Sequence, residues 1–132
     1  MKILKKIIII FLLIITFFSV SMRIMGFAPY SITTQSMEPV MSVNDLVYVN
    51  PVDFKMLNTG DIITYASEDG VTVTHRIVSI DKEKETVRTK GDNNEYPDAL
   101  SVKKEQIIGK VIFSVPGIGI VTNTINSIKS KL

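Results

Sequence analysis

The sequence contains no cysteine and only one histidine, His75, among its 132 residues. The missing thiols exclude disulfide scaffolds, zinc fingers and cysteine nucleophiles. One imidazole is too few for the usual catalytic zinc site, which takes two or three histidine ligands. Chemistry in this chain must therefore come from hydroxyls, carboxylates, lysines and His75, and we expect neither a metal nor another cofactor.

The net charge is small, because 15 basic residues against 13 acidic ones give only +2. Six basic residues lie near the two ends, in stretches that hold no acid: Lys2, Lys5, Lys6, Arg23, Lys129 and Lys131. Residues 24–128 therefore carry a net negative charge. A nucleic-acid-binding protein concentrates basic charge on its folded part, so we expect no nucleic acid among the partners. The length allows one folded domain.

Residues 7–22 form an uncharged, strongly apolar run that follows the lysines of the N-terminus. As a helix this run covers roughly 24 Å, and flanking lysine and arginine side chains extend it toward a hydrocarbon core of about 30 Å. The pattern is also typical of a cleaved secretory signal, with Ser19-Val20-Ser21 as a small-x-small cleavage site. Both interpretations keep the lysines in the cytoplasm and place the rest of the chain outside.

Beyond Pro29 the sequence predicts short strands in place of helices. We expect them at residues 45–49, 60–65, 71–81, 86–90 and 107–115. Glu68-Asp69-Gly70 predicts a tight hairpin turn and residues 82–84 a charged turn, whereas residues 91–98 form a loop rich in turn formers. These patterns predict a mainly β fold, with a small antiparallel, partly closed β-sheet domain behind one N-terminal transmembrane helix.

The C-terminal tail has apolar residues at helical spacing: Val121, Ile125, Ile128 and Leu132. This spacing favours a short amphipathic helix on a protein or membrane surface. The intervening asparagine, threonine and serine residues have poor helix propensity, which favours a frayed terminus equally.

Four side chains are candidates for chemistry. Ser36 lies a dozen residues after the apolar run, and a serine nucleophile needs an adjacent base. His75 falls in the apolar register of its expected strand, where burial is costly unless the ring nitrogens are hydrogen-bonded. Asp92 and Asp98 lie in the loop at 91–98. The alternatives are a turn serine, a structural core histidine, and aspartates that cap backbone N–H groups.

Five segments together resemble the type I signal peptidase family. They occur in the family's order and cover the chain from the apolar run to Gly119: Ser36-Met37-Glu38-Pro39, Gly60-Asp61-Ile62-Ile63-Thr64-Tyr65, Thr74-His75-Arg76-Ile77-Val78, Thr89-Lys90-Gly91-Asp92-Asn93-Asn94 with Asp98, and Gly109-Lys110-Val111 through Pro116-Gly117-Ile118-Gly119. The usual bacterial enzymes carry Lys-Arg in place of His75-Arg76. The resemblance is therefore to the Ser-His type of the endoplasmic reticulum and archaea, also found in some Gram-positive bacteria.

The resemblance implies a membrane-bound serine endopeptidase that removes signal peptides from exported preproteins. Ser36 would be the nucleophile, His75 the general base and Asp98 the residue that orients the imidazole. Asp92 would be either catalytic or structural. The oxyanion would be held by the Ser36 N–H and by the hydroxyl of Thr34, which stands where the family carries serine; Gln35 stands where it carries glycine.

The resemblance also implies an organisation and a location. Residues 1–6 would be cytoplasmic, residues 7–25 an uncleaved transmembrane signal-anchor, and residues 26–132 a catalytic domain at the outer face of the cell membrane. The partners would be signal peptides of secreted or membrane preproteins, the lipid bilayer and the protein-export machinery. The alternative is a catalytically inactive, membrane-tethered β-domain that acts as a binding or scaffold protein. That alternative predicts loss of Ser36, His75 or the loop aspartates, and all of them are present.

Overall fold

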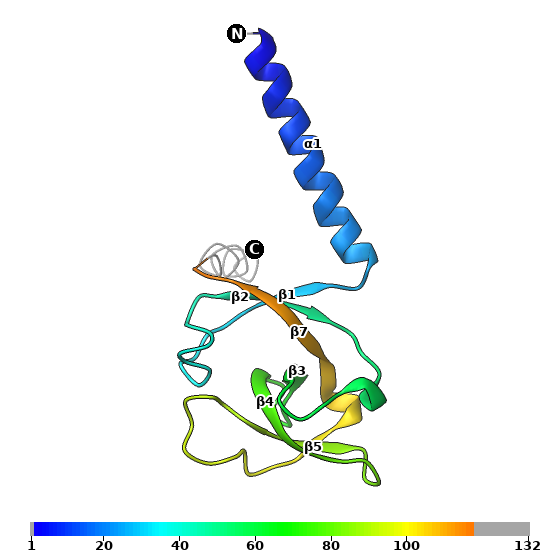
Figure 1. Ribbon diagram of the computed structural model, residues 1–132, viewed down its shortest axis with the longest axis vertical. Helices are drawn as coiled ribbons and strands as arrows, with labels where there is room; N and C mark the ends of the chain where they lie inside the picture. The colour runs from blue at the N-terminus through cyan, green and yellow to red at the C-terminus, as the bar shows by residue number, and fades with distance from the viewer. Residues whose placement is uncertain (1, 118–132) are drawn as a thin grey trace.

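The computed structural model describes residues 2–117. Helix α1 (Lys2–Ile24) projects from a single curled β-sheet, and none of its residues is buried (Figure 1). Its 23 residues extend about 35 Å at the α-helical rise, which makes α1 long and apolar enough to cross a bilayer. The helix ends in a Schellman motif: Gly26, at a φ of 83°, donates to Arg23 O and Phe27 donates to Met22 O.

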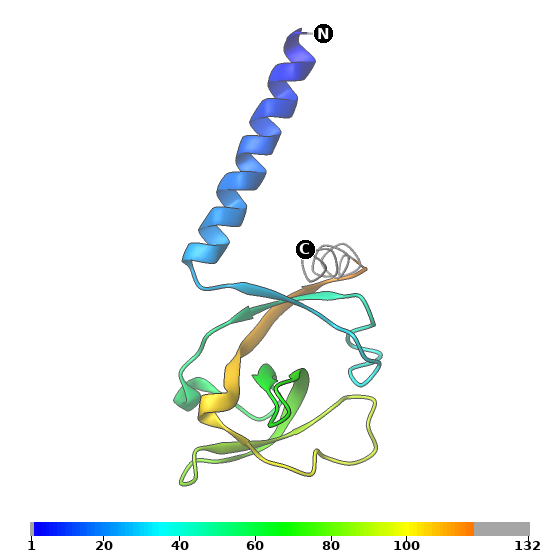
Figure 2. The same cartoon turned by 180° about the vertical axis from the view of Figure 1, so that it is seen from behind.

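Within residues 2–117, seven strands form one antiparallel sheet in the order β1-β2-β7-β3-β4-β5-β6. Their bounds are β1 Ala28–Ser31, β2 Leu46–Asn50, β3 Ile62–Ala66, β4 Thr72–Asp81, β5 Thr86–Lys90, β6 Val102–Lys103 and β7 Ile107–Val115. Two short 3-10 helices, Phe54–Met56 and Lys104–Gln106, lie between strands. The sheet curls so that β7 passes between its two halves (Figure 2). The mainly β, partly closed fold expected from the sequence is confirmed.

The five expected strands are present: the bounds at 86–90 and 107–115 are as expected, and the other three strands have ends moved by one or two residues. Two further strands were not expected. β1 contains Pro29, which lacks a backbone N–H and is tolerated because β1 lies at an edge of the sheet. β6 has only two residues, too few for a recognisable alternation. The proposed helix in residues 121–132 lies outside the described residues.

The expected turn at residues 68–70 is present as the hairpin between β3 and β4. Gly70 has a φ of 76° and donates to Ser67 O, while Ser67 donates to Val71 O. At the other end of β4, the carboxylate of Asp81 accepts backbone hydrogen bonds from Glu83 and Lys84. Both predicted turns therefore define the length of β4.

Two clusters of buried side chains pack inside the curl. One lies between β3, β4, β5 and β6 and contains Leu57, Ile63, Tyr65, Ile77, Val87 and Val102. The other contains Val47 and Val49 of β2 and three side chains from the irregular segment after β1: Ile32, Met37 and Met41. Burial of such side chains contributes about 1.5–3 kcal/mol each. This segment is therefore fixed by packing, although it has no regular secondary structure.

β4 has one open edge over its first half. It pairs with β3 from Thr72 to Arg76, but its pairing with β5 begins only at Arg76, opposite Lys90. Among the described residues, no strand pairs with the other side of residues 72–75. The irregular segment after β1 and the loop after β5 lie on the same side of the sheet, opposite the side at which α1 joins it (Figures 1 and 2).

Candidate active site

Ser36 lies on the irregular segment after β1, directly before the buried Met37. Two backbone hydrogen bonds connect the start of this segment to the turn before β2: Ile32 N donates to Asp45 O, and Asn44 N donates to Ile32 O. Further along, Met41 N donates to Met37 O. The hydroxyl of Ser36 is thus presented from a backbone that is held on both sides.

His75 lies in the middle of β4 with its side chain turned inward, opposite Ile63 of β3. It is 8% exposed, and Ile77 on the same face is 1% exposed, as the alternation of the sequence indicates. A histidine at this depth needs hydrogen bonds for both ring nitrogens. The structure provides one partner for each of them.

The structure brings Ser36, His75 and Asp98 together from three separate segments. The Oγ atom of Ser36 lies 3.1 Å from Nε2 of His75, and Nδ1 of His75 lies 2.7 Å from Oδ2 of Asp98. A carboxylate can only accept, so Nδ1 carries the proton and Nε2 is left to accept from the serine hydroxyl. This is the order of groups that activates a serine nucleophile.

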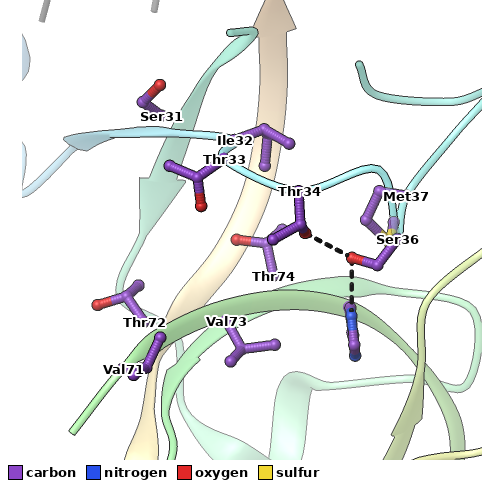
Figure 3. A pocket seen from close by; sticks show the side chains of 11 residues that line it. Ser31, Ile32, Thr33, Thr34, Ser36, Met37, Val71, Thr72, Val73 and Thr74 are labelled. Carbon is purple, nitrogen blue, oxygen red and sulfur yellow. Dashed lines mark hydrogen bonds between the residues drawn. The ribbon is translucent and has the colours of Figure 1, made fainter. Parts of the chain in front are cut away.

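Thr34 lies beside Ser36. Its Oγ1 atom is 3.0 Å from the serine Oγ, and the two side chains point toward each other (Figure 3). When Ser36 donates its single hydroxyl proton to His75, Thr34 is the donor in this contact. The backbone N–H of Ser36 has no hydrogen-bond partner within residues 2–117. Both groups expected to hold an oxyanion therefore lie next to the nucleophile with a proton to donate.

Gln35, which replaces a family glycine, fits this loop without strain. The non-glycine residues of the described chain with positive φ are Asn44 and Glu85, so the backbone of Gln35 needs no glycine. Glycine is required instead at Gly91, in the loop opposite. A Cβ atom there would lie 2.6 Å from the carbonyl oxygen of Ser36.

Asn93 connects that loop to the nucleophile. Its backbone N–H donates to Ser36 O at 2.8 Å, and its Nδ2 atom donates to Gln35 O at 3.2 Å. Sequence reasoning gave Asn93 no role of its own. The only local signal is its place in the Gly-Asp-Asn-Asn run, which does not reveal the partner.

Asp98 has two further partners that sequence reasoning missed. Thr89 Oγ1 donates to Asp98 Oδ2 at 2.7 Å, and the Tyr65 hydroxyl donates to the same oxygen at 3.3 Å. Burial raises the pKa of Tyr65, and the charge and hydrogen bond of Asp98 add to this, against the opposing effect of the Thr89 hydroxyl. The tyrosine therefore remains a donor at neutral pH. Alternation could have placed Thr89 on the inward face beside Val87.

Asp92 does not join this group, and its expected role as a cap of backbone N–H groups is wrong. Within the described residues its carboxylate accepts from Arg76 instead, from Nε at 2.8 Å and from Nη2 at 2.6 Å. This hydrogen bonding raises the pKa of Arg76. The arginine reaches Asp92 because it alternates with His75 along β4 and leaves the strand on the other face.

A groove of about 330 Å³ leads to the serine. The end of β1 and the irregular segment after it form one wall with residues 31–34, 36 and 37, and the start of β4 with the residue before it forms the other, residues 71–75 (Figure 3). The open edge of β4 therefore faces a groove that contains Ser36 and His75. An extended peptide is the shape of ligand that such an edge can bind.

The comparisons with known proteins point to the same family. The family model described as "Signal peptidase, peptidase S26" matches residues 2–93, a range that includes Ser36 and His75 and ends before Asp98. Signal peptidase I W of Bacillus subtilis (strain 168) is 37% identical over 87 residues, which is 64% of this chain and 46% of that protein. The signal peptidase complex catalytic subunit sec11 of Dictyostelium discoideum is 31% identical over 98 residues, 66% of this chain and 54% of that protein. The chain spans about half the length of these relatives.

Proposed function

The chain belongs to the signal peptidase family, peptidase S26, and we propose that it is a membrane-bound serine endopeptidase that removes signal peptides from exported preproteins. The observation that carries this proposal is the chain of hydrogen bonds from Asp98 through His75 to Ser36. It ends in the groove, where a peptide has access to the serine hydroxyl.

In the proposed reaction, Ser36 Oγ attacks the carbonyl carbon of the scissile peptide bond. His75 Nε2 takes the hydroxyl proton as the new C–O bond forms, and the imidazolium is stabilised by the carboxylate of Asp98. His75 then gives this proton to the leaving amine as the C–N bond breaks. Water releases the acyl group from Ser36 by the same steps. Acid–base help of this kind contributes about 10²–10⁴ in rate.

The negative charge on the carbonyl oxygen is proposed to be held by the Ser36 N–H and the Thr34 hydroxyl. What supports this is their position beside the nucleophile and the absence of another partner for that N–H within the described residues. Fixed donors of this kind each contribute about 10²–10³ to catalysis.

The substrate is proposed to bind as an extended strand between residues 31–34 and the open edge of β4. Backbone groups on that edge have no partner strand in the described chain, so they can pair with a peptide. Ile32, Met37 and Val73 give the groove an apolar lining. Small, uncharged side chains before the scissile bond are the proposed occupants of this groove.

The anchor is proposed to comprise residues 7–25, with residues 1–6 in the cytoplasm and residues 26–132 at the outer face of the cell membrane. The lysines before the apolar run favour this orientation. Ser36 follows α1 closely along the chain, which keeps it near the surface where a preprotein emerges from the membrane. The bilayer, signal peptides and the protein-export machinery are the proposed partners.

An inactive tethered domain is the weaker alternative. Its site would have no need of two buried hydroxyls on Asp98 or of an imidazole with a partner at each nitrogen. Such an arrangement costs burial of polar groups, and a binding domain gains nothing from it.

The test is cleavage of a preprotein with small residues at positions −3 and −1 by the full chain in lipid vesicles. We expect wild type to cleave, and Ser36→Ala and His75→Ala each to abolish cleavage. The double variant should be no worse than either single one, because the two residues act as a unit. Ser79→Ala, an exposed serine of the same strand as His75, is the matched control and should cleave normally. An inactive wild type, or normal cleavage by Ser36→Ala, would reject the proposal.

A further inference from the structure

The oxygen of Asp98 that contacts His75 receives three hydrogen bonds. His75 Nδ1 and Thr89 Oγ1 both lie at 2.7 Å from Oδ2, and the Tyr65 hydroxyl lies at 3.3 Å. Tyr65 OH is also 3.3 Å from Thr89 Oγ1, so the two hydroxyls contact each other as well as the carboxylate. Thr89 is fully buried and Tyr65 nearly so. Two buried hydroxyls thus share with His75 the one carboxylate oxygen that contacts the imidazole.

We propose that Thr89 and Tyr65 are positioning residues that act on His75 through Asp98: by sharing Oδ2 with the ring they weaken the hold of the carboxylate on the imidazolium. The inference rests on the proposed function, in which a neutral His75 must accept the Ser36 proton. A hydrogen bond to a carboxylate partly neutralises its negative charge. Each hydroxyl therefore weakens the electrostatic attraction between Asp98 and the imidazolium of His75.

The sheet register explains why these two residues reach Asp98. Thr89 of β5 pairs with Ile77 of β4, and Tyr65 of β3 pairs with Val73 of β4. Ile77 and Val73 are each two residues from His75 along β4, so their side chains point to the same face of the sheet as His75, and paired residues share a face. Both hydroxyls therefore lie on the His75 face, one on each neighbouring strand.

Asp98 does not depend on the Thr89 hydroxyl for its position. Its backbone N–H donates to Thr89 O at 2.8 Å, and its own carbonyl accepts from Arg88 Nε at 3.4 Å. Pro97 before it restricts the backbone. Removal of the Thr89 hydroxyl alone should therefore leave the carboxylate beside His75, with one fewer hydrogen-bond donor competing with the ring for Oδ2.

Few charged groups within residues 2–117 lie near Ser36, His75 and Asp98. In that part of the chain Asp98 is the charged group in contact with His75, and Tyr65 is the nearby titratable side chain. Arg88 touches the carbonyl of Asp98, and Glu68 lines a cavity of about 260 Å³ together with Tyr65 and Asp98.

The Arg76–Asp92 pair lies on the other face of β4. None of these charges is removed by changing Thr89, so its effect on His75 can be measured by itself.

The test exploits the single histidine, since its ¹⁵N resonances need no assignment. The full chain, labelled with ¹⁵N-histidine and placed in detergent micelles, is titrated as wild type, Thr89→Val, Thr89→Ser and Tyr65→Phe. We expect Thr89→Val to raise the pH at which His75 protonates by about half a unit to one unit, the size of one hydrogen bond. Thr89→Ser keeps the hydroxyl and should restore the wild-type midpoint. Tyr65→Phe should raise it less, because its contact is longer.

Thr64→Val is the matched control. Thr64 is as buried as Thr89 and its hydroxyl bonds Thr74, on the opposite face of the sheet from Asp98. Thr64→Val should not change the pH at which His75 is half protonated. A purely structural role for Thr89 would let Asp98 move away, and the midpoint would then fall; an unchanged or lower midpoint in Thr89→Val overturns the inference.

The pH dependence of preprotein cleavage is a second measurement of the same effect. Thr89→Val should lose about three- to tenfold in kcat below the His75 midpoint and little well above it, because only the fraction of neutral imidazole changes. An inactive wild type would reject the proposed function, whereas the titration would still decide whether Thr89 acts on His75.

Discussion

Arg76 binds the carboxylate of Asp92 through two hydrogen bonds, while the residue before it in β4, His75, binds Asp98. Neighbours in a strand point to opposite faces, so the two aspartates of one loop are held on two sides of the sheet. Between them, Asn93 reaches the carbonyl of Ser36. β4 therefore supplies the proposed base and also anchors the loop that steadies the proposed nucleophile.

Asp92→Asn should lower the free energy of unfolding by about 1–2 kcal/mol, the range of a charged hydrogen bond reduced by solvent screening, since a third of the Arg76 side chain is exposed. Turnover should fall only modestly, through looser contacts of Asn93 with Ser36. Urea unfolding and kcat measure the two effects. Asp69→Asn, in the exposed hairpin turn, is the matched control and should change neither. A thousandfold loss of turnover at unchanged stability would make Asp92 catalytic.

Asp98→Asn should preserve the fold and lose most of the activity, by up to ~10⁴ in kcat. The amide oxygen can still accept from Thr89, so the loop stays in place. If its NH₂ group faces Nδ1, however, the ring must carry its proton on Nε2 and can no longer accept from Ser36. Cleavage rate and melting temperature are compared with wild type. Normal turnover would remove Asp98 from the mechanism.

The sequence was informative where a local pattern decides the structure. Period-two alternation predicts that His75 points inward, and Asp-Gly predicts the hairpin turn at the start of β4; the structure has both. The partners of Asp92 and Asp98 depend on pairing between strands far apart in sequence. The register that sets Arg76 opposite Lys90 and Ile77 opposite Thr89 appears in no local pattern. For that reason the sequence alone leaves open whether Asp92 is catalytic, structural or a cap of backbone N–H groups.

Thr34→Val should lower kcat by about 10²-fold with little change in KM, because a hydroxyl that meets the oxyanion only in the transition state is removed. Thr34→Ser keeps the hydroxyl and should retain most of the rate. Steady-state kinetics on one preprotein separate the two constants. Equal rates for Thr34→Val and Thr34→Ser would mean that the hydroxyl takes no part and that Ser36 N–H serves alone.

Tyr65 should make the fold sensitive to high pH. Burial raises the pKa of Tyr65 above its ordinary value of 10.0, so the folded protein holds this proton more tightly than the unfolded chain does. The corresponding stability is complete below the unfolded value and is lost as pH rises through the folded one. Urea unfolding at about pH 8 and about pH 10.5 should show a smaller drop in stability for Tyr65→Phe than for wild type. Equal drops would show that Tyr65 does not contribute.

The orientation of the anchor can be read with single cysteines, because the chain has none of its own. Asp69→Cys, in the exposed turn between β3 and β4, should react with a membrane-impermeant maleimide added outside intact cells or protoplasts. Lys2→Cys should react only after the membrane is permeabilised, because lysines before an apolar run favour the cytoplasmic side for the N-terminus. The reverse pattern would place the sheet in the cytoplasm and exclude preprotein cleavage at the outer face. A signal cleaved near Met22 gives a third result: the mature protein would carry no label from Lys2→Cys, even after permeabilisation.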